Sequence, residues 1–167
     1  MAVIRRLFEE CADFFRLIHG DPVAEAEQIF DDLPPGKRPE DKLVFGICVS
    51  GGNDRLVGLV ELLRDYPMQH DWCLGLLVLA PAYRGRGLGA ATVAAISRFV
   101  SLSTARTLQM VVQEQNPAAL RFWQRHGFVI RDWTSQAAAH GTNQVARLVL
   151  ALPTAPDAPS GSPAPAG

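Results

Sequence analysis

The 167-residue chain lacks the features that mark membrane, secreted and nucleic-acid-binding proteins. It has no uninterrupted apolar run of about 18 residues, the length that a membrane-spanning helix needs. Its first residues do not show the basic-then-apolar pattern of a secretory signal. Its formal net charge is only −1, so it has no general excess of basic residues for nucleic acid. We therefore expect no membrane partner and no nucleic-acid partner.

Cysteine and histidine are few and scattered. The three cysteines, Cys11, Cys48 and Cys73, are odd in number and widely spaced, which indicates free thiols in a reducing compartment rather than a disulfide framework. No group of His, Cys and acidic residues has the spacing of metal ligands. We expect a cytoplasmic protein that uses no metal.

The chain is long enough for one domain, which we place at residues 1–152. Residues 153–167 are rich in Pro and Ala and predict a disordered tail. Residues 1–41 contain ten acidic against five basic side chains, whereas residues 76–150 contain eight Arg against only Glu114 and Asp132. A basic half suits a polyanionic ligand and an acidic half suits a cationic one, although solvated helix faces explain the acidic half equally well.

A segment rich in Gly and Arg links an apolar stretch, Trp72–Ala80, to an apolar helix predicted from about Leu88. Three glycines alternate here with two arginines and a leucine, in the order Arg84, Gly85, Arg86, Gly87, Leu88, Gly89. A strand–loop–helix turn of this kind directs unpaired backbone N–H groups at a ligand, and glycine lets that ligand come close. The loop is therefore predicted to hold a phosphate or a pyrophosphate.

Three known phosphate loops compete for this segment. The P-loop does not fit because no Gly-Lys-Ser/Thr closes it. Gly85–Ala90 satisfies the relaxed dinucleotide fingerprint, but two extended segments precede it and no acid follows at about 20 residues. The third is the coenzyme A loop of the GNAT family of N-acetyltransferases, Arg/Gln-x-x-Gly-x-Gly/Ala. Arg84–Gly89 matches that pattern at every fixed position.

A second segment also resembles the GNAT family. Asn116–Phe128 reads NPAALRFWQRHGF and is similar to the family's Asn-x-x-Ala helix that ends in a Gly-Phe step. The gap between the two motifs accommodates one helix and one strand, as the family requires. The resemblance spans residues 43–150.

The order of elements predicts an α+β fold with a mixed central sheet flanked by helices, as the resemblance also implies. Apolar residues recur at helical spacing over Val3–Ile18, and Asp21 begins a second predicted helix. Hairpins, a strand–helix–strand–helix segment and a closing hairpin follow. The family's fold opens with a short strand, but here the helical pattern starts almost at Met1, so we expect that strand to be missing or very short.

The resemblance implies that acetyl-CoA is the co-substrate and that a primary amine of a small molecule or peptide is the acceptor; it also allows a homodimer. The pantetheine arm would pair with the backbone of Leu77 and Leu79, and Asn116 would contact the cofactor or acceptor besides capping its helix. The pyrophosphate would bind the loop, namely Arg84, Gly85, Arg86, Gly87 and Gly89.

Glu61 is the candidate general base. It is the only acid in the apolar run Leu56–Leu63, and burial raises the pKa of a carboxylate toward a value useful for catalysis. Alternatively, Glu61 pairs with an Arg across the sheet or lies at its edge. Asp65 and Tyr66, at the end of the same run, are further candidates for acceptor contact.

The general acid stays unassigned. The family commonly uses a Tyr on the helix of the second motif, and alignment places Trp123 there. An indole N–H donates a hydrogen bond but does not act as an acid at neutral pH. A non-catalytic acyl-CoA-binding domain and a nucleotide-binding regulatory module are therefore alternatives to an N-acetyltransferase.

Overall fold

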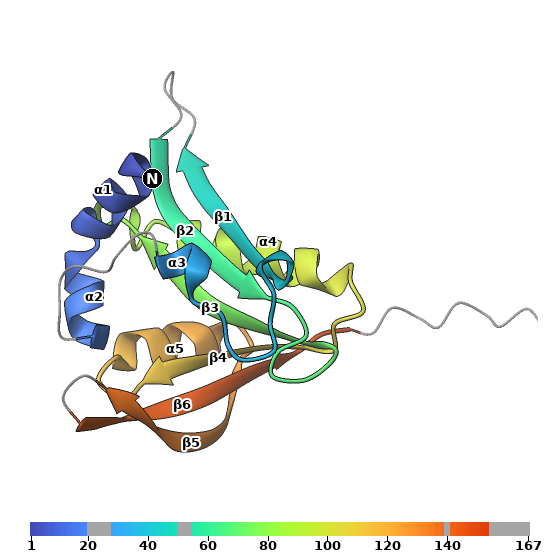
Figure 1. Ribbon diagram of the computed structural model, residues 1–167. Helices are drawn as coiled ribbons and strands as arrows, with labels where there is room; N and C mark the ends of the chain where they lie inside the picture. Colours follow the sequence, from blue (N-terminus) through green and yellow to red (C-terminus); the bar gives the residue numbers. More distant parts are fainter. Residues whose placement is uncertain (20–27, 50–54, 139–140, 154–167) are drawn as a thin grey trace, which may run out of the picture.

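The computed structural model describes residues 1–19, 28–49, 55–138 and 141–153, which contain one six-stranded sheet with helices on both faces (Figure 1). The strands are β1 (Lys42–Val49), β2 (Arg55–Leu63), β3 (Asp71–Leu79), β4 (Thr107–Gln113), β5 (Val129–Ala138) and β6 (Gly141–Ala151). The helices are α1 (Ala2–Glu10), α2 (Ala12–His19), α3 (Gln28–Asp31), α4 (Leu88–Ser101) and α5 (Pro117–Arg125), with 3-10 turns η1 (Pro39–Asp41) and η2 (Pro81–Tyr83).

The strand order is β1-β2-β3-β4-β6-β5, and the sheet splits in its middle. β3 and β4 are parallel neighbours over only three residue pairs, Asp71–Cys73 with Thr107–Gln109. Beyond these pairs the two strands diverge, as Figure 1 shows. The remaining neighbours are antiparallel. The upper part of β3 therefore presents one backbone edge to a gap instead of to a strand.

Two apolar clusters hold helices on opposite faces of the sheet. On one face α4 and α5 pack against the sheet through buried side chains such as Val93, Ile96 and Trp123. On the other face α1 and α2 pack against β2 and β3, with Leu7 and Phe15 buried. Strand side chains alternate between the faces. The sheet thus separates the α4–α5 layer from the α1–α2 layer.

The predicted α+β fold with a mixed, helix-flanked sheet is confirmed. In residues 1–19 and 28–41 no strand precedes β1, in agreement with the expected loss of the family's first strand. The helix expected over Val3–Ile18 is two helices that meet at Cys11, a fully buried residue. The predicted start of the next helix at Asp21, and the tail from residue 154 onward, lie outside the described residues.

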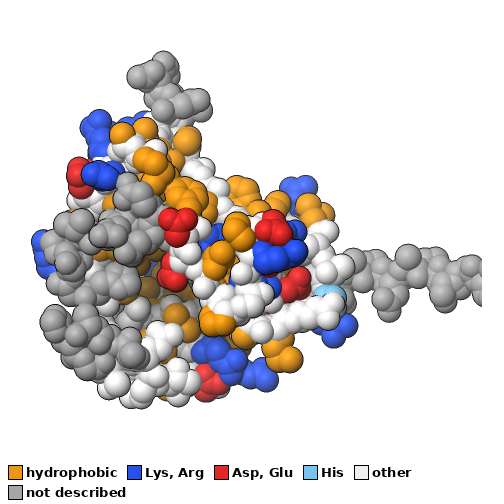
Figure 2. Space-filling view, viewed as in Figure 1, with side chains coloured by type: hydrophobic (Ala, Val, Ile, Leu, Met, Phe, Trp, Pro, Cys, Tyr) orange, Lys and Arg blue, Asp and Glu red, His pale blue; other side chains and the backbone are white. Residues whose placement is uncertain are grey.

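Acidic and basic side chains lie next to one another on the face seen in Figure 2, as expected from the nearly balanced charge. None of the helices in the described ranges is long and apolar enough to cross a membrane. Within the same ranges no three His, Cys, Asp or Glu side chains come together as a group that could hold a metal ion.

Candidate active site

The Gly-rich loop ends at the first residue of α4 with its backbone open to solvent. Gly87 precedes the helix at φ +83°, and no atom lies within 4 Å of the place that a Cβ would occupy. The first helical bond of this turn runs from Ala91 N–H to Gly87 C=O at 3.0 Å. The N–H groups of the three preceding helical residues therefore have no carbonyl four residues back. Together with the helix dipole they suit an anion.

A cavity of about 480 Å³ adjoins this loop. β3, the loop, α2, α4 and α5 all contribute to its wall. Six of the predicted cofactor residues line it: Leu77, Leu79, Arg84, Gly85, Gly87 and Gly89. Arg86 lies outside this lining. The structure thus brings most of the predicted loop and strand residues to one cavity.

The free edge of β3 fixes how Leu77 and Leu79 are oriented. Ala80 N–H donates to Val57 C=O at 2.8 Å, so Val57 and Ala80 are a hydrogen-bonded pair that continues the β2–β3 ladder. Hydrogen-bonded and non-hydrogen-bonded pairs alternate in an antiparallel ladder. The backbone groups of Leu77 and Leu79 therefore face away from β2, toward the gap beside β4.

A narrower cavity of about 210 Å³ fills the gap between β3 and β4. It shares Phe14 and Leu77 with the wider cavity, so the two cavities adjoin. Asn116 and Trp123 of the second motif also line it, as does Gly75 of β3. The two cavities together run from the start of α4 to Gly75.

Glu61 lies behind Gly75, a residue in the wall of the narrow cavity, and lines neither cavity itself. The β2–β3 register shifts at this point, because Glu61 faces Leu76 while Leu62 faces Leu74, and Gly75 is the extra residue of a β-bulge. A Cβ on Gly75 would lie only 2.9 Å from Oε1 of Glu61. The carboxylate therefore lies directly against the Gly75 backbone, in space that a side chain at position 75 would occupy.

The carboxylate of Glu61 is paired, but with a lysine rather than with the arginine considered from the sequence. Lys42 Nζ lies 3.2 Å from Oε1, with side-chain exposures of 4% for Lys42 and 18% for Glu61. Lys42 also donates to the backbone carbonyl of Asp32. Burial raises the pKa of Glu61, and the charge of Lys42 acts against that rise. Glu61 is thus both a structural partner and a carboxylate with an elevated pKa.

The guanidinium of Arg84 forms hydrogen bonds within the protein. Its Nε donates to Leu79 C=O at 2.8 Å, and its two terminal nitrogens bind both carboxylate oxygens of Asp13, one of them at 3.0 Å. The hydrogen bond from Arg84 lowers the pKa of Asp13. The guanidinium therefore ties α2 to the end of β3, and Phe14 of α2 forms part of both cavities.

The second motif contributes a cap and an aromatic wall. Asn116 Oδ1 accepts the N–H of Ala119 at 3.1 Å, which confirms the predicted helix cap. Trp123 is 7% exposed and packs edge-to-face on Phe128 with ring centroids 5.2 Å apart. Both tyrosines of the chain are described, and neither lines either cavity.

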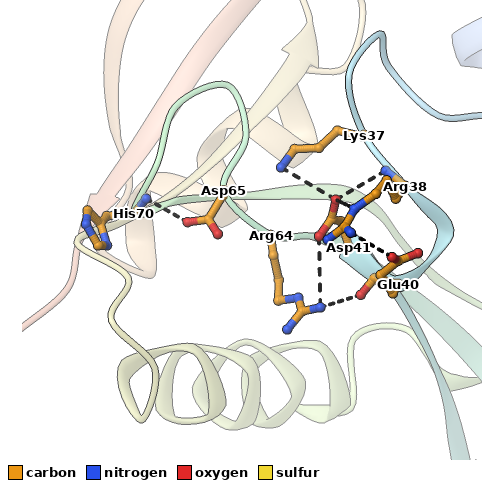
Figure 3. A network of polar contacts seen from close by, with 7 residues as sticks. All are labelled: Lys37, Arg38, Glu40, Asp41, Arg64, Asp65 and His70. Atoms are coloured by element: carbon orange, nitrogen blue, oxygen red, sulfur yellow. Dashed lines mark hydrogen bonds and ion pairs between the residues drawn. The ribbon is translucent and has the colours of Figure 1, made fainter.

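Asp65, considered for acceptor contact, instead holds the β2–β3 turn. Its Oδ1 accepts the N–H of His70 at 2.7 Å (Figure 3). Figure 3 also shows Asp41 surrounded by basic side chains, including Arg38 and Arg64. This network fixes the segment that immediately precedes Lys42, and so it supports the partner of Glu61 from outside the site.

Comparison with known proteins agrees with the geometry. The model of the acetyltransferase (GNAT) family matches residues 4–128, three quarters of the chain. The chain belongs to the GNAT family. An acetyltransferase structure from Thermus thermophilus is 26% identical to this GNAT protein, with a TM-score of 0.65 and a match that covers 90% of each chain.

More distant structures share the fold of this GNAT protein. A nourseothricin acetyltransferase is 22% identical over 68% of this chain and 66% of its own, with a TM-score of 0.59. A chimera of the spermidine N-acetyltransferase SpeG from Vibrio cholerae is 18% identical over 67% of this chain and 68% of its own, with a TM-score of 0.57. A comparison with curated proteins gives no match.

Sequence reasoning missed several residues that shape this GNAT site. Gly75 could have been found, because a glycine inside an apolar strand indicates a bulge or a close approach. Lys42 opens β1 and carries no local signal of pairing with Glu61. Asp13 and Phe14 lie in a helix whose docking onto β3 is a long-range contact, and no local pattern predicts it.

Proposed function

We propose that this GNAT protein transfers an acetyl group from acetyl-CoA directly to a primary amine of a small molecule or peptide. The observation that carries the proposal is the place of Glu61, a carboxylate with a raised pKa that lies against Gly75 in the wall of the narrow cavity. We further propose that residues 1–152 form the catalytic domain, that it acts in the cytoplasm, and that it needs no metal.

The two adjoining cavities fit a long ligand with a charged middle and a thin arm. The backbone N–H groups at the start of α4 suit its pyrophosphate, and the free edge of β3 at Leu77 suits the amide groups of its arm. When bound, acetyl-CoA supplies an activated thioester carbonyl. In this proposal acetyl-CoA is held largely through backbone groups, cavity walls and the helix cap, by Leu77, Leu79, Gly85, Gly87, Gly89 and Asn116. Arg84 holds the loop in place, and Arg86 adds positive charge beside it.

Glu61 would accept the proton of the incoming amine. An alkyl amine with a pKa of about 10.4 is charged at pH 7, and its deprotonation there costs roughly 4–5 kcal/mol. Burial raises the pKa of Glu61 toward the working pH, which favours proton acceptance by one of its oxygens. Lys42 keeps the carboxylate oriented and limits that rise. The proton thus has a defined acceptor at the bulge.

Departure of the thiolate does not require a strong acid. Thiols have a pKa of about 8.5, so a thiolate is a tolerable leaving group. Trp123 lines the narrow cavity and its N–H is a hydrogen-bond donor only. Burial raises the pKa of the Cys73 thiol to about 11, so this cysteine is a poor nucleophile. None of the three cysteines, all of which the structure describes, lines either cavity, and this supports direct transfer over an acyl-cysteine route.

The acceptor class is tested with a panel of amines. We would titrate the protein with acetyl-CoA, desulfo-CoA and ATP by calorimetry, then follow release of free CoA with polyamines, aminoglycosides, amino acids and short peptides. The proposal expects binding of both CoA compounds and CoA release with at least one amine, and Glu61→Gln is the matched control. Binding of ATP alone would indicate a nucleotide module. Acetyl-CoA binding without release for any amine would indicate a non-catalytic domain.

A further inference from the structure

The last turn of α5 forms a cationic wall of the wider cavity. Arg125 ends the helix, and His126 follows it as the C-cap residue. Both line the cavity of about 480 Å³ beside the Gly-rich loop. Neither residue belongs to the loop motif, and neither is needed to describe how the start of α4 holds an anion.

Arg125 is the arginine of this cavity whose charge is available to a ligand. Arg84 also lines the cavity, but Asp13 and the carbonyl of Leu79 bind its guanidinium. Arg86 lies outside the lining. Arg125 forms no hydrogen bond or ion pair with any residue in the described ranges.

The ring of His126 lies beside Arg125 in the wall of the wider cavity. Its Nδ1 lies 2.7 Å from the carbonyl oxygen of Phe122. Because a carbonyl can only accept, Nδ1 carries the hydrogen and donates it. The ring also packs against the Phe122 ring with centroids 4.4 Å apart, so its orientation is fixed. Nε2 is then the ring nitrogen left for a ligand, and it donates to a phosphate oxygen only when both ring nitrogens carry a hydrogen.

The two faces of α5 indicate which part of a ligand comes to this wall. One face of the helix lines the narrow cavity through Ala119 and Trp123, whereas the neighbouring face, with Phe122, Arg125 and the following His126, lines the wide one. A ligand with its thioester at Gly75 and its pyrophosphate at the start of α4 has its adenosine end left for the wide cavity. That end of coenzyme A carries a third phosphate, on the ribose 3′ position.

Resting on the proposed function, we propose that Arg125, with His126 beside it, binds the 3′-phosphate of coenzyme A. This is an anion subsite separate from the pyrophosphate site at the start of α4. A charged hydrogen bond between Arg and phosphate corresponds to about 10- to 100-fold in affinity. The protein should therefore prefer coenzyme A over 3′-dephospho-CoA by a factor in that range.

Calorimetry with these two compounds tests the subsite. Arg125→Ala should weaken coenzyme A by about 10- to 100-fold and leave 3′-dephospho-CoA nearly unchanged, so that the preference disappears. Arg121→Ala, a loss of the same charge from an exposed position on the same helix that lines neither cavity, is the matched control and should keep the preference.

Two results would overturn the subsite. One is equal affinity of the parent protein for coenzyme A and 3′-dephospho-CoA, which needs no variant and so does not depend on folding. The other is an equal loss for both compounds in Arg125→Ala, which would assign Arg125 to the pyrophosphate instead. If neither compound binds the parent, the proposed function itself fails, and the two failures are thus distinguishable.

Discussion

Replacing Glu61 by Gln tests the chemistry at the bulge. The amide keeps the shape of the side chain and can still accept from Lys42, but it cannot take a proton. We expect turnover at pH 7 to fall about 10²- to 10⁴-fold, the usual contribution of a general base. At about 1.36 kcal/mol per tenfold, this is roughly 2.7–5.4 kcal/mol of activation free energy.

The same substitution should lower stability without unfolding the protein. It leaves the ammonium of Lys42, which is 4% exposed, opposite a neutral amide, and removing one charge of a buried pair costs about 3–5 kcal/mol. Lys42 keeps its bond to the carbonyl of Asp32. We therefore expect a folded protein with unchanged acetyl-CoA affinity, measured by circular dichroism, thermal melting and calorimetry.

The pH profile of CoA release separates a base from a structural partner. A base works deprotonated, so parent turnover should fall as the pH drops through the raised pKa of Glu61, and Glu61→Gln should lack this limb. The deficit should shrink at high pH, where the free amine is already abundant. Glu10→Gln, which breaks the ion pair between Glu10 of α1 and Arg55 of β2, is the control with unchanged turnover. Full activity of Glu61→Gln at pH 7 would refute the reasoning.

Three further changes have defined outcomes. Lys42→Met removes the charge that lowers the pKa of Glu61, so the acidic limb of the pH–rate profile should move to higher pH; an unmoved limb would contradict the pairing. Asn116→Ala should cost about 1 kcal/mol of unfolding free energy through loss of the cap, measured by denaturant titration. In a double-mutant cycle with Asp13→Asn and Arg84→Ala, the coupling free energy of unfolding should be about 1 kcal/mol or less, since both side chains are partly exposed. Because Arg84 lowers the pKa of Asp13, that coupling should be present above about pH 3.9 and disappear as the pH falls through the lowered pKa.

Local patterns predicted most of the fold. Apolar periodicity, turn residues and the Asn116–Pro117 cap located the strands and helices because each depends on a few neighbouring residues. The break at Cys11 has no such signal, since the residue fits the helical stripe on both sides. The family's missing first strand was predictable because the helical pattern begins almost at Met1.

The site was only partly predictable because its parts meet through long-range packing. The Gly-rich loop was found from spacing alone, and so was Glu61 as an acid in an apolar strand. The sequence did not reveal that Asp13 forms an ion pair with Arg84, since the two residues are 71 positions apart in the chain. The Lys42–Glu61 pair likewise depends on the β1–β2 register.

The central claim is that acetyl-CoA binds with its pyrophosphate at the start of α4, and the most direct test is calorimetry of acetyl-CoA with Gly87→Val. Gly36→Val is the matched control, because both glycines have φ near +82° and no atom within 4 Å of a Cβ. Each change should therefore carry a similar backbone strain of roughly 1–2 kcal/mol. We expect Gly87→Val to be folded and to show no heat of binding at concentrations that saturate the parent, whereas Gly36→Val binds normally. Normal binding by folded Gly87→Val would contradict the account.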